Sequence, residues 1–329
     1  MGSIFFRGLL LLTVVFFSSW GFLVHRTIHQ LAVYELPKPM QSFFYKNMNY
    51  LVENAGRPDQ RRNQDSTEAT KHFIDLEAFG DSAAWKMPFK WDDAVKIFTK
   101  DTLLEYGYVP YHIITMKNKL TSAFRSLNKD SILFYATDLA HYIGDANVPL
   151  HTSLNYDGQL TNQHGLHSLW ESMVPEIEIE QYNLYSHHKA NYLSDPEQTV
   201  WDCIRRANKL LPDVFGKEIE ATKEFVDSTK FRTQMRRGKE VKSFTSAFAK
   251  SYSKLLGQTI NDQLLNSAMM IADFWYTAWV DAGKPDLSSL LSKPFEKKDK
   301  DALKQEYKAW KNNELIEKKL LLSKKQTSQ

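Results

Sequence analysis

The residue types best suited to chemistry lie between positions 141 and 171. His141 precedes Asp145 by four residues, and His167 precedes Glu171 by the same interval. Residues four apart on a helix share a face, with about 5–6 Å between Cβ atoms. Each interval therefore predicts an imidazole–carboxylate pair, and these groups are ligands that Zn²⁺ takes at about 2.0–2.2 Å. His151 follows a Pro-Leu turn, from which a loop residue can reach a neighbouring ion.

Histidine is concentrated in this segment. The chain has 10 histidines in 329 residues, and His141, His151, His164 and His167 all fall within it. An isolated histidine beside apolar residues is ordinarily a core or surface residue. Here two of the four have an acid at the helical interval, so a metal site is the better explanation. His164 is more simply a surface residue.

Upstream fragments add further candidates. His72 stands at the edge of a predicted helix, and Asp59 lies in the polar loop before it. His25 follows Trp20 with four residues between them. Each fragment is weak evidence alone, and the argument depends on their combination with the downstream cluster.

The N-terminus has the organisation of a signal peptide over residues 1–19. A short basic segment precedes an apolar run that is too short for a bilayer, which takes about 20 apolar residues. Ser18 and Ser19 then offer small residues for cleavage. We therefore expect an exported protein, periplasmic or secreted, whose mature chain begins at Trp20. The alternative is an uncleaved anchor, because Phe17 stands where a small residue is preferred.

Composition favours one folded unit. The chain is 43% hydrophobic and 25% charged, and no Pro/Gly/Ser-rich linker or repeat divides it. We expect a catalytic domain over residues 20–285 and a Lys/Glu-rich C-terminal extension over residues 286–329. The net charge of +3 is too small to indicate a nucleic-acid or membrane partner. The single cysteine, Cys203, excludes an internal disulfide and is predicted to pack as a small hydrophobe.

Apolar periodicity is helical over nearly the whole chain, so we predict an all-α fold. The segments predicted as helices are 24–36, 91–98, 103–124, 130–143, 165–173, 199–211, 217–228 and 244–282. Loops are expected at 53–70, 145–165 and 186–198. Apolar residues of the extension form one stripe, which predicts a helix folded back on the body. A helix that faces a partner or a membrane is the alternative.

Taken together, these segments resemble the superfamily of zinc-dependent bacterial phospholipases C and S1/P1 single-strand nucleases. The similarity covers residues 20 to about 283 and implies a single helical domain with three zinc ions in a cleft. The implied ligands are Asp59, His72, His141 and Asp145 for the first ion; His151, His167 and Glu171 for the second; and Trp20, His25 and the bridging Asp145 for the third. Trp20 would bind through its α-amino nitrogen and carbonyl oxygen, which requires cleavage directly before it.

The resemblance also implies a reaction. A metal-activated water attacks the phosphorus of a phosphodiester, and Asp59 orients or deprotonates that water while Asp145 bridges two ions. A monomer is expected.

Two substrate classes remain open, and the residues divide between them. Glu171 and the short stretch from His151 to His167 favour a phospholipase-C-like enzyme that acts on a phospholipid, which we prefer at this point. The short Trp20–His25 spacing favours the alternative, a nuclease that acts on single-stranded nucleic acid. A non-catalytic exported zinc protein is the third possibility. If zinc served only to stabilise it, the cleft would be filled by side chains, because a catalytic zinc site keeps an exchangeable position. A metal-binding module without turnover would show the same ligands.

Overall fold

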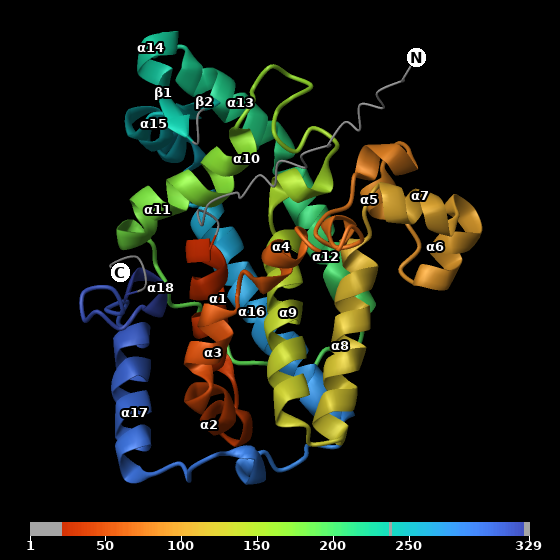
Figure 1. Ribbon diagram of the computed structural model, residues 1–329, viewed down its shortest axis with the longest axis vertical. Coiled ribbons are helices and arrows are strands. Elements are labelled where there is room, and N and C mark those ends of the chain that lie inside the picture. Colours follow the sequence, from red (N-terminus) through yellow and green to blue (C-terminus); the bar gives the residue numbers. More distant parts are fainter. Residues whose placement is uncertain (1–21, 237–238, 326–329) are drawn as a thin grey trace, which may run out of the picture.

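Helices build most of the described chain, which in this computed structural model comprises residues 22–236 and 239–325 (Figure 1). Four long helices form the body: α1 (Phe22–Glu35), α8 (Val109–Arg125), α9 (Lys129–Ala146) and α16 (Thr259–Asp281). Each of α1 and α8 packs against both α9 and α16, and α9 also packs against α16. The all-α prediction is confirmed. Among the described residues, no helix is both long and apolar enough to cross a membrane.

The central helix is α9, and its sequence explains its place. The Asn128 side chain accepts the backbone N–H of Ser131 and caps the first turn. Every residue from 136 to 146 is buried, including His141 and Asp145. A helix end this enclosed brings polar side chains into the interior, where they require polar partners.

Shorter helices surround this body. They are α2 (Lys38–Lys46), α3 (Met48–Glu53), α4 (Arg57–Arg61), α5 (Ala83–Lys86), α6 (Trp91–Phe98), α7 (Lys100–Glu105), α10 (Leu166–Ser168), α11 (Val174–Glu178), α12 (Pro196–Lys209), α13 (Leu211–Thr222), α14 (Asp227–Lys230), α15 (Ser246–Leu256), α17 (Lys297–Lys311) and α18 (Leu322–Lys325). A π-helical stretch, Leu169–Met173, joins α10 to α11. Such stretches occur frequently at functional sites.

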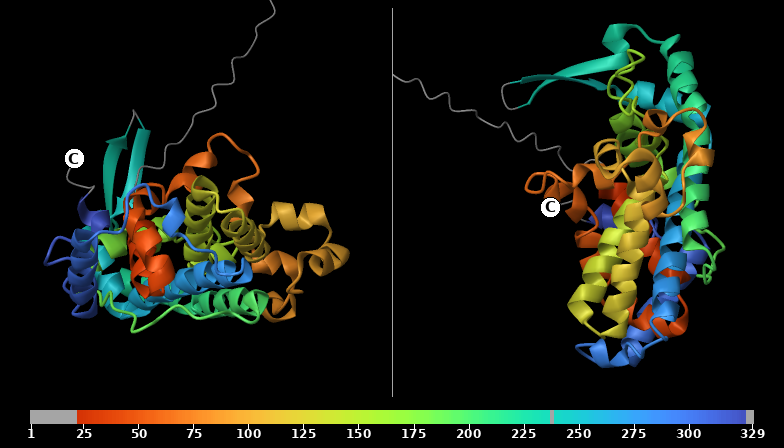
Figure 2. Two further views of the ribbon diagram at one scale, coloured as in Figure 1. Left: turned by 90° about the horizontal axis from the view of Figure 1, so that it is seen from below. Right: turned by 90° about the vertical axis from the view of Figure 1, so that its right-hand side faces the viewer.

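The structure differs from the sequence prediction at several places: α2 and α3 were not predicted, and the predicted helix 217–228 is replaced by α13, which ends at Thr222, and α14. Gly107, with φ 86°, separates α7 from α8, and Gly257, with φ 60°, separates α15 from α16. Both conformations favour glycine, so each predicted single helix is two. An antiparallel hairpin of β1 (Phe231–Arg236) and β2 (Lys239–Phe244) projects from the body (Figure 2). It was not predicted, because its strands lack a clear apolar–polar alternation. The helix α4 also lies within a stretch predicted as loop.

The C-terminal extension packs on the body, as predicted. Trp310 of α17 is fully buried, and its ring lies 5.6 Å from that of Tyr34 in α1. Its Nε1 donates a hydrogen bond of 2.6 Å to the carbonyl oxygen of Leu184. Leu315 and Leu321 are buried nearby in sequence. The apolar stripe therefore faces the core.

Candidate metal centre

Eight of the nine predicted ligands lie in the described part of the chain, and the fold brings all eight together. They form three groups: His25, His141 and Asp145; Asp59, His72 and His141; and His151, His167 and Glu171. Within each group, ligand atoms lie within 4.8 Å of one another. The ninth, Trp20, lies outside the described residues, as does the predicted signal peptide.

Separate elements supply these side chains. The N-terminal part of α1 supplies His25, α4 supplies Asp59, and the C-terminal end of α9 supplies both His141 and Asp145. The remainder come from short turns: His72 after the 3₁₀ turn Ala69–Lys71, His151 in the 3₁₀ turn Pro149–Thr152, His167 in α10 and Glu171 in the π-helical stretch. The centre thus lies where the start of α1 meets the end of α9.

The group of Asp59, His72 and His141, together with Asp145, has the dimensions of a metal site. His72 Nδ1 lies 3.2 Å from His141 Nε2, and Asp145 Oδ2 lies 2.8 Å and 3.3 Å from the same two nitrogens. Asp59 Oδ1 lies 3.7 Å from His72 Nδ1 and 3.8 Å from His141 Nε2. Neighbouring ligand atoms around a tetrahedral Zn²⁺ are about 3.3–3.4 Å apart, given bonds of about 2.0–2.1 Å. The measured separations scatter around that value.

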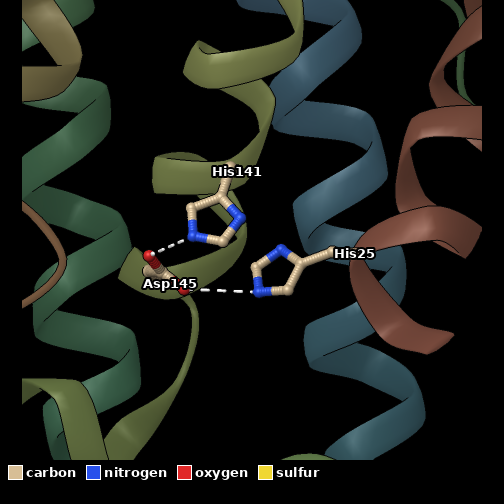
Figure 3. Close-up of side chains that lie close together, drawn as sticks. All are labelled: His25, His141 and Asp145. Carbon is tan, nitrogen blue, oxygen red and sulfur yellow. Dashed lines mark ion pairs between the residues drawn. The ribbon is translucent and has the colours of Figure 1, made fainter. Parts of the chain in front are cut away.

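Asp145 faces two groups with its two oxygens (Figure 3). Oδ2 is directed to His72 and His141, whereas Oδ1 lies 3.4 Å from His25 Nε2. The rings of His25 and His141 stack with their centroids 4.1 Å apart. A single buried carboxylate therefore lies between two of the ligand groups.

The group of His151, His167 and Glu171, which are the predicted ligands of the second ion, lies beside the rest of the centre. His167 Nε2 lies 2.6 Å from Glu171 Oε2 and 2.8 Å from His151 Nε2. Glu171 Oε2 is 3.6 Å from His151 Nε2, and Oε1 is 3.6 Å from His25 Nε2. The contact between Glu171 and His25 was not expected from the sequence. Glu171 thus lies between two groups, as Asp145 does.

The centre is open to solvent at two places. Asp59 and His167 have side-chain exposures of 36% and 32%, whereas His25, His141 and Asp145 are at most 3% exposed. Two ligand side chains are therefore reached by solvent. The donor set of imidazoles and carboxylates suits Zn²⁺.

A family model for S1/P1 nuclease matches residues 20–280, which is most of the chain. The chain belongs to the S1/P1 nuclease family. Membership of this family confirms the superfamily inferred from the sequence.

One solved structure is also similar to this chain, but at a level that adds nothing to the family assignment. A crystal structure of the alpha-toxin of Clostridium perfringens, from avian strain SWCP, is similar with 13% sequence identity and a TM-score of 0.49. The similarity covers 82% of this chain and 65% of the toxin chain, so the chain spans just under two thirds of the toxin's length. A search of curated proteins found no match. Family membership therefore rests on the S1/P1 nuclease model.

In this S1/P1 nuclease family member, the buried acids of the centre are ionised. Burial alone would raise the pKa of Asp145, but the neighbouring His141 and hydrogen bonds from His25 and His72 hold that pKa well below its usual range. Burial opposes ionisation of Glu171 too, and His167 is the main group that keeps its pKa low. Two carboxylates are thus available as anionic ligands.

The imidazoles differ in their protonation when no metal is bound. Burial lowers the pKa of His25, but Asp145 and Glu171 more than offset it and raise that pKa to about 10. Burial likewise opposes protonation of His72, and Asp145 raises its pKa to about 9. Burial dominates for His141, whose pKa falls to about 4. A metal ion must therefore displace protons from His25 and His72.

Backbone carbonyls orient two of the rings. His141 Nδ1 lies 2.8 Å from the carbonyl oxygen of Ala55, and His151 Nδ1 lies 2.9 Å from that of His72. A carbonyl only accepts, so Nδ1 carries the proton and the unprotonated Nε2 faces the centre. Such partners fix both the tautomer and the direction of a ligand.

The sequence analysis did not identify a set of charged residues that lies beside His72 and α4, on the side away from the metal centre. Glu68 lies 3.6 Å from His72 Nε2, and Asp138 accepts contacts from two arginines that flank Asp59. Glu68 precedes His72 by four residues, the same interval that revealed the other imidazole–carboxylate pairs. It could have been found by the same rule.

Proposed function

We propose that this protein is a zinc-dependent phosphodiesterase with three metal sites. The first is formed by Asp59, His72, His141 and Asp145; the second by His151, His167 and Glu171; and the third by His25, Asp145 and the mature N-terminal Trp20. The observation that carries this proposal is Asp145, which is buried and directs its two oxygens to different groups of imidazoles. A buried carboxylate is stable only where positive charge offsets the loss of its hydration, and two metal ions bridged by Asp145 would supply that charge.

Zn²⁺ bound in these sites supplies Lewis acidity, which makes water a better nucleophile and offsets negative charge on phosphate. The residues of the chain perform the other tasks. Asp59, with its exposed carboxylate on the rim of the centre, accepts the proton of the attacking water. The water oxygen forms a bond to phosphorus, the bond to the leaving oxygen breaks, and that oxygen takes up a proton. Asp145, buried and anionic, fixes the positions of the imidazoles of two sites relative to each other.

Single-stranded nucleic acid is the substrate that we propose first, because the matching family model is that of the S1/P1 nucleases. This reverses the preference drawn from the sequence. A phospholipid remains the second candidate, supported by Glu171 as the acid of the second site and by the short segment between His151 and His167.

A paired assay tests both candidates on purified mature protein. One reaction contains single-stranded DNA or RNA and the other contains phosphatidylcholine, each before and after chelation and zinc restoration. Nucleotide release that depends on restored zinc is the expected result. Diacylglycerol release alone would make the enzyme a phospholipase. Absence of zinc-restored turnover in both reactions would refute catalysis on these substrates.

Export and cleavage before Trp20 belong to the same proposal, because the third site needs a free α-amino group. The family match starts at residue 20, and Phe22 packs closely against Gly56, which directly precedes α4. A mature protein with one additional residue before Trp20 should lose about one equivalent of metal. Unchanged metal content would show that the N-terminus is not a ligand.

A further inference from the structure

The Asp59 carboxylate has little of its own to hold it in place. Among the described residues it makes no hydrogen bond, and the nearest side-chain nitrogens, those of Arg62, His72 and His141, lie 3.7–3.8 Å away. Its position is therefore set by the backbone of α4. A helix of five residues does not form by its own propensity, because nucleation is unfavourable. Other contacts must fix α4 beside the metal centre.

Two arginines provide these contacts from either side of Asp59. Arg57 donates hydrogen bonds from Nε (3.0 Å) and Nη2 (2.5 Å) to Oδ1 of Asp138. Arg61 forms an ion pair of 2.8 Å between Nη1 and Oδ2 of the same residue. Asp138 is 1% exposed and lies on α9, so each of its oxygens holds one guanidinium group. The Arg57 guanidinium also lies 4.1 Å from the ring centroid of Phe134, one turn earlier on α9.

Arg61 also connects this network to Glu68, which lies beside the metal ligand His72. Its Nη2 and Nε donate to the two carboxylate oxygens of Glu68 at 3.1 and 3.3 Å. Glu68 is 1% exposed and also accepts from Tyr142 and Lys71.

Glu68 in turn faces the back of a metal ligand. Its Oε1 lies 3.6 Å from His72 Nε2, a buried nitrogen with no hydrogen-bond partner among the described residues. His72 Nδ1 is on the opposite side of the ring and faces the centre. A carboxylate behind a ligating imidazole orients the ring and increases its basicity.

One face of α9 therefore carries both the ligands and their supports. Asp138, His141, Tyr142 and Asp145 stand at positions i, i+3, i+4 and i+7, which lie on the same side of a helix. His141 and Asp145 reach the centre directly. Asp138 and Tyr142 reach it through the charged network described above.

We propose that Asp138 and Glu68 are positioning residues for the first metal site. Asp138 holds α4, and with it Asp59, through Arg57 and Arg61, and Glu68 holds His72 directly. This inference rests on the proposed function, since it assigns a role toward the ions of that centre. The contact between Arg61 and Glu68 pairs two N–H groups with two carboxylate oxygens, and such a contact fixes orientation as well as proximity. The network thereby couples the position of α4 to that of α9.

The test is metal affinity in the mature full chain, measured by competition with a chromophoric chelator and by elemental analysis. Asp138→Asn keeps the shape of the side chain and removes the charge that holds both arginines. We expect one metal equivalent to bind about 10- to 100-fold more weakly, with the remaining equivalents unchanged. The matched control is Asp273→Asn, which removes an acid that pairs with His188 at 2.8 Å outside the three ligand groups. It should leave every metal affinity unchanged.

A second variant and a double variant separate positioning from general stability. Arg61→Lys keeps the charge but cannot bridge Asp138 and Glu68, so it should weaken the same equivalent. If Asp138 acts through Asp59, the double variant of Asp59→Asn and Asp138→Asn should bind metal as Asp59→Asn alone does. Additive losses would contradict the proposal.

Each remaining outcome has a definite meaning. Wild-type affinities in Asp138→Asn and Arg61→Lys would overturn the positioning role and leave the proposed function intact. An equal weakening of all metal equivalents, together with a lower melting temperature of the metal-free protein, would show a general stabilising role instead. A wild-type chain that binds no zinc would overturn the proposed function and this inference with it.

Discussion

Replacing Asp145 by asparagine tests the centre most directly. The change keeps the size of the side chain but leaves a single oxygen, with an NH₂ group in place of the other. Oδ2 now faces His72 and His141 at 2.8 and 3.3 Å, and Oδ1 faces His25 at 3.4 Å. Whichever way the amide turns, one of the two sites faces a donor that cannot bind a metal ion.

The expected magnitude follows from burial. Asp145 is 1% exposed, and removing one partner from a buried ionic arrangement costs about 3–5 kcal/mol. At about 1.4 kcal/mol for each factor of ten, this weakens binding at the affected site by roughly 10²- to 10⁴-fold. Zinc content should therefore fall by about one equivalent or more, and hydrolysis should be abolished, because the reaction is proposed to need all the ions.

Two assays measure this effect. Elemental analysis of protein dialysed against a weak chelator gives the metal content, and the paired hydrolysis assay gives the activity. Asp273→Asn serves as the control, because it also exchanges an acid for its amide but lies outside the metal-ligand groups. An Asp145→Asn variant with full metal content and full activity would refute the bridging role. Loss of activity with unchanged metal content would show that Asp145 acts in the reaction without bridging ions.

Three further predictions follow from the structure. Metal binding should release the protons that His25 and His72 carry in the metal-free protein, whose pKa values of about 10 and about 9 lie above neutral pH. Affinity should therefore rise with pH up to about 10, and calorimetry in buffers of different ionisation enthalpy should show net proton release; the same heat in all buffers would contradict this. Gly144→Ala places a Cβ 3.0 Å from His25 Nδ1, so it should displace that ring and lower metal content at an overpacking cost of about 1–3 kcal/mol. The control Gly216→Ala, whose Cβ would meet nothing within 4 Å, should instead stabilise its helix by up to about 1 kcal/mol, and equal effects of the two changes would be inconsistent with the packing described. Burial raises the pKa of Glu35 from 4.5 to about 8, so the folded protein favours the neutral acid and loses stability as pH rises from about 4.5 to about 8. At pH 7 the free energy of unfolding of Glu35→Gln should therefore exceed that of wild type by about 3 kcal/mol, and the variant should unfold at a higher temperature. At pH 4 the two proteins should be equally stable. A difference that does not change with pH would contradict the raised pKa.

The sequence alone determined the local part of this centre. The four-residue intervals of His141 with Asp145 and of His167 with Glu171 predicted contacts that the structure has at 3.3 and 2.6 Å. Helical periodicity likewise predicted α9 to within three residues at each end. These features depend on helix geometry, which is set by backbone dihedral angles and hydrogen bonds a few residues apart.

Resemblance to a family extended that prediction to distant residues. Spacing alone did not connect Asp59, His72 and His25 to α9, because tens of residues separate them from it. The family's ligand pattern did, and the fold brings all three beside Asp145 or His141. No local rule contains this information, since such contacts form only when separate elements pack together.

Tertiary structure decided the rest. It directed the two oxygens of Asp145 to different imidazoles, and it placed Glu171 Oε1 beside His25 as well as Oε2 beside the second site. It also paired Asp138 of α9 with the arginines of α4, a helix that lies within a stretch predicted as loop. Orientation and burial of polar groups depend on every neighbouring element at once, because a buried charge is stable only where the packed fold supplies its partners.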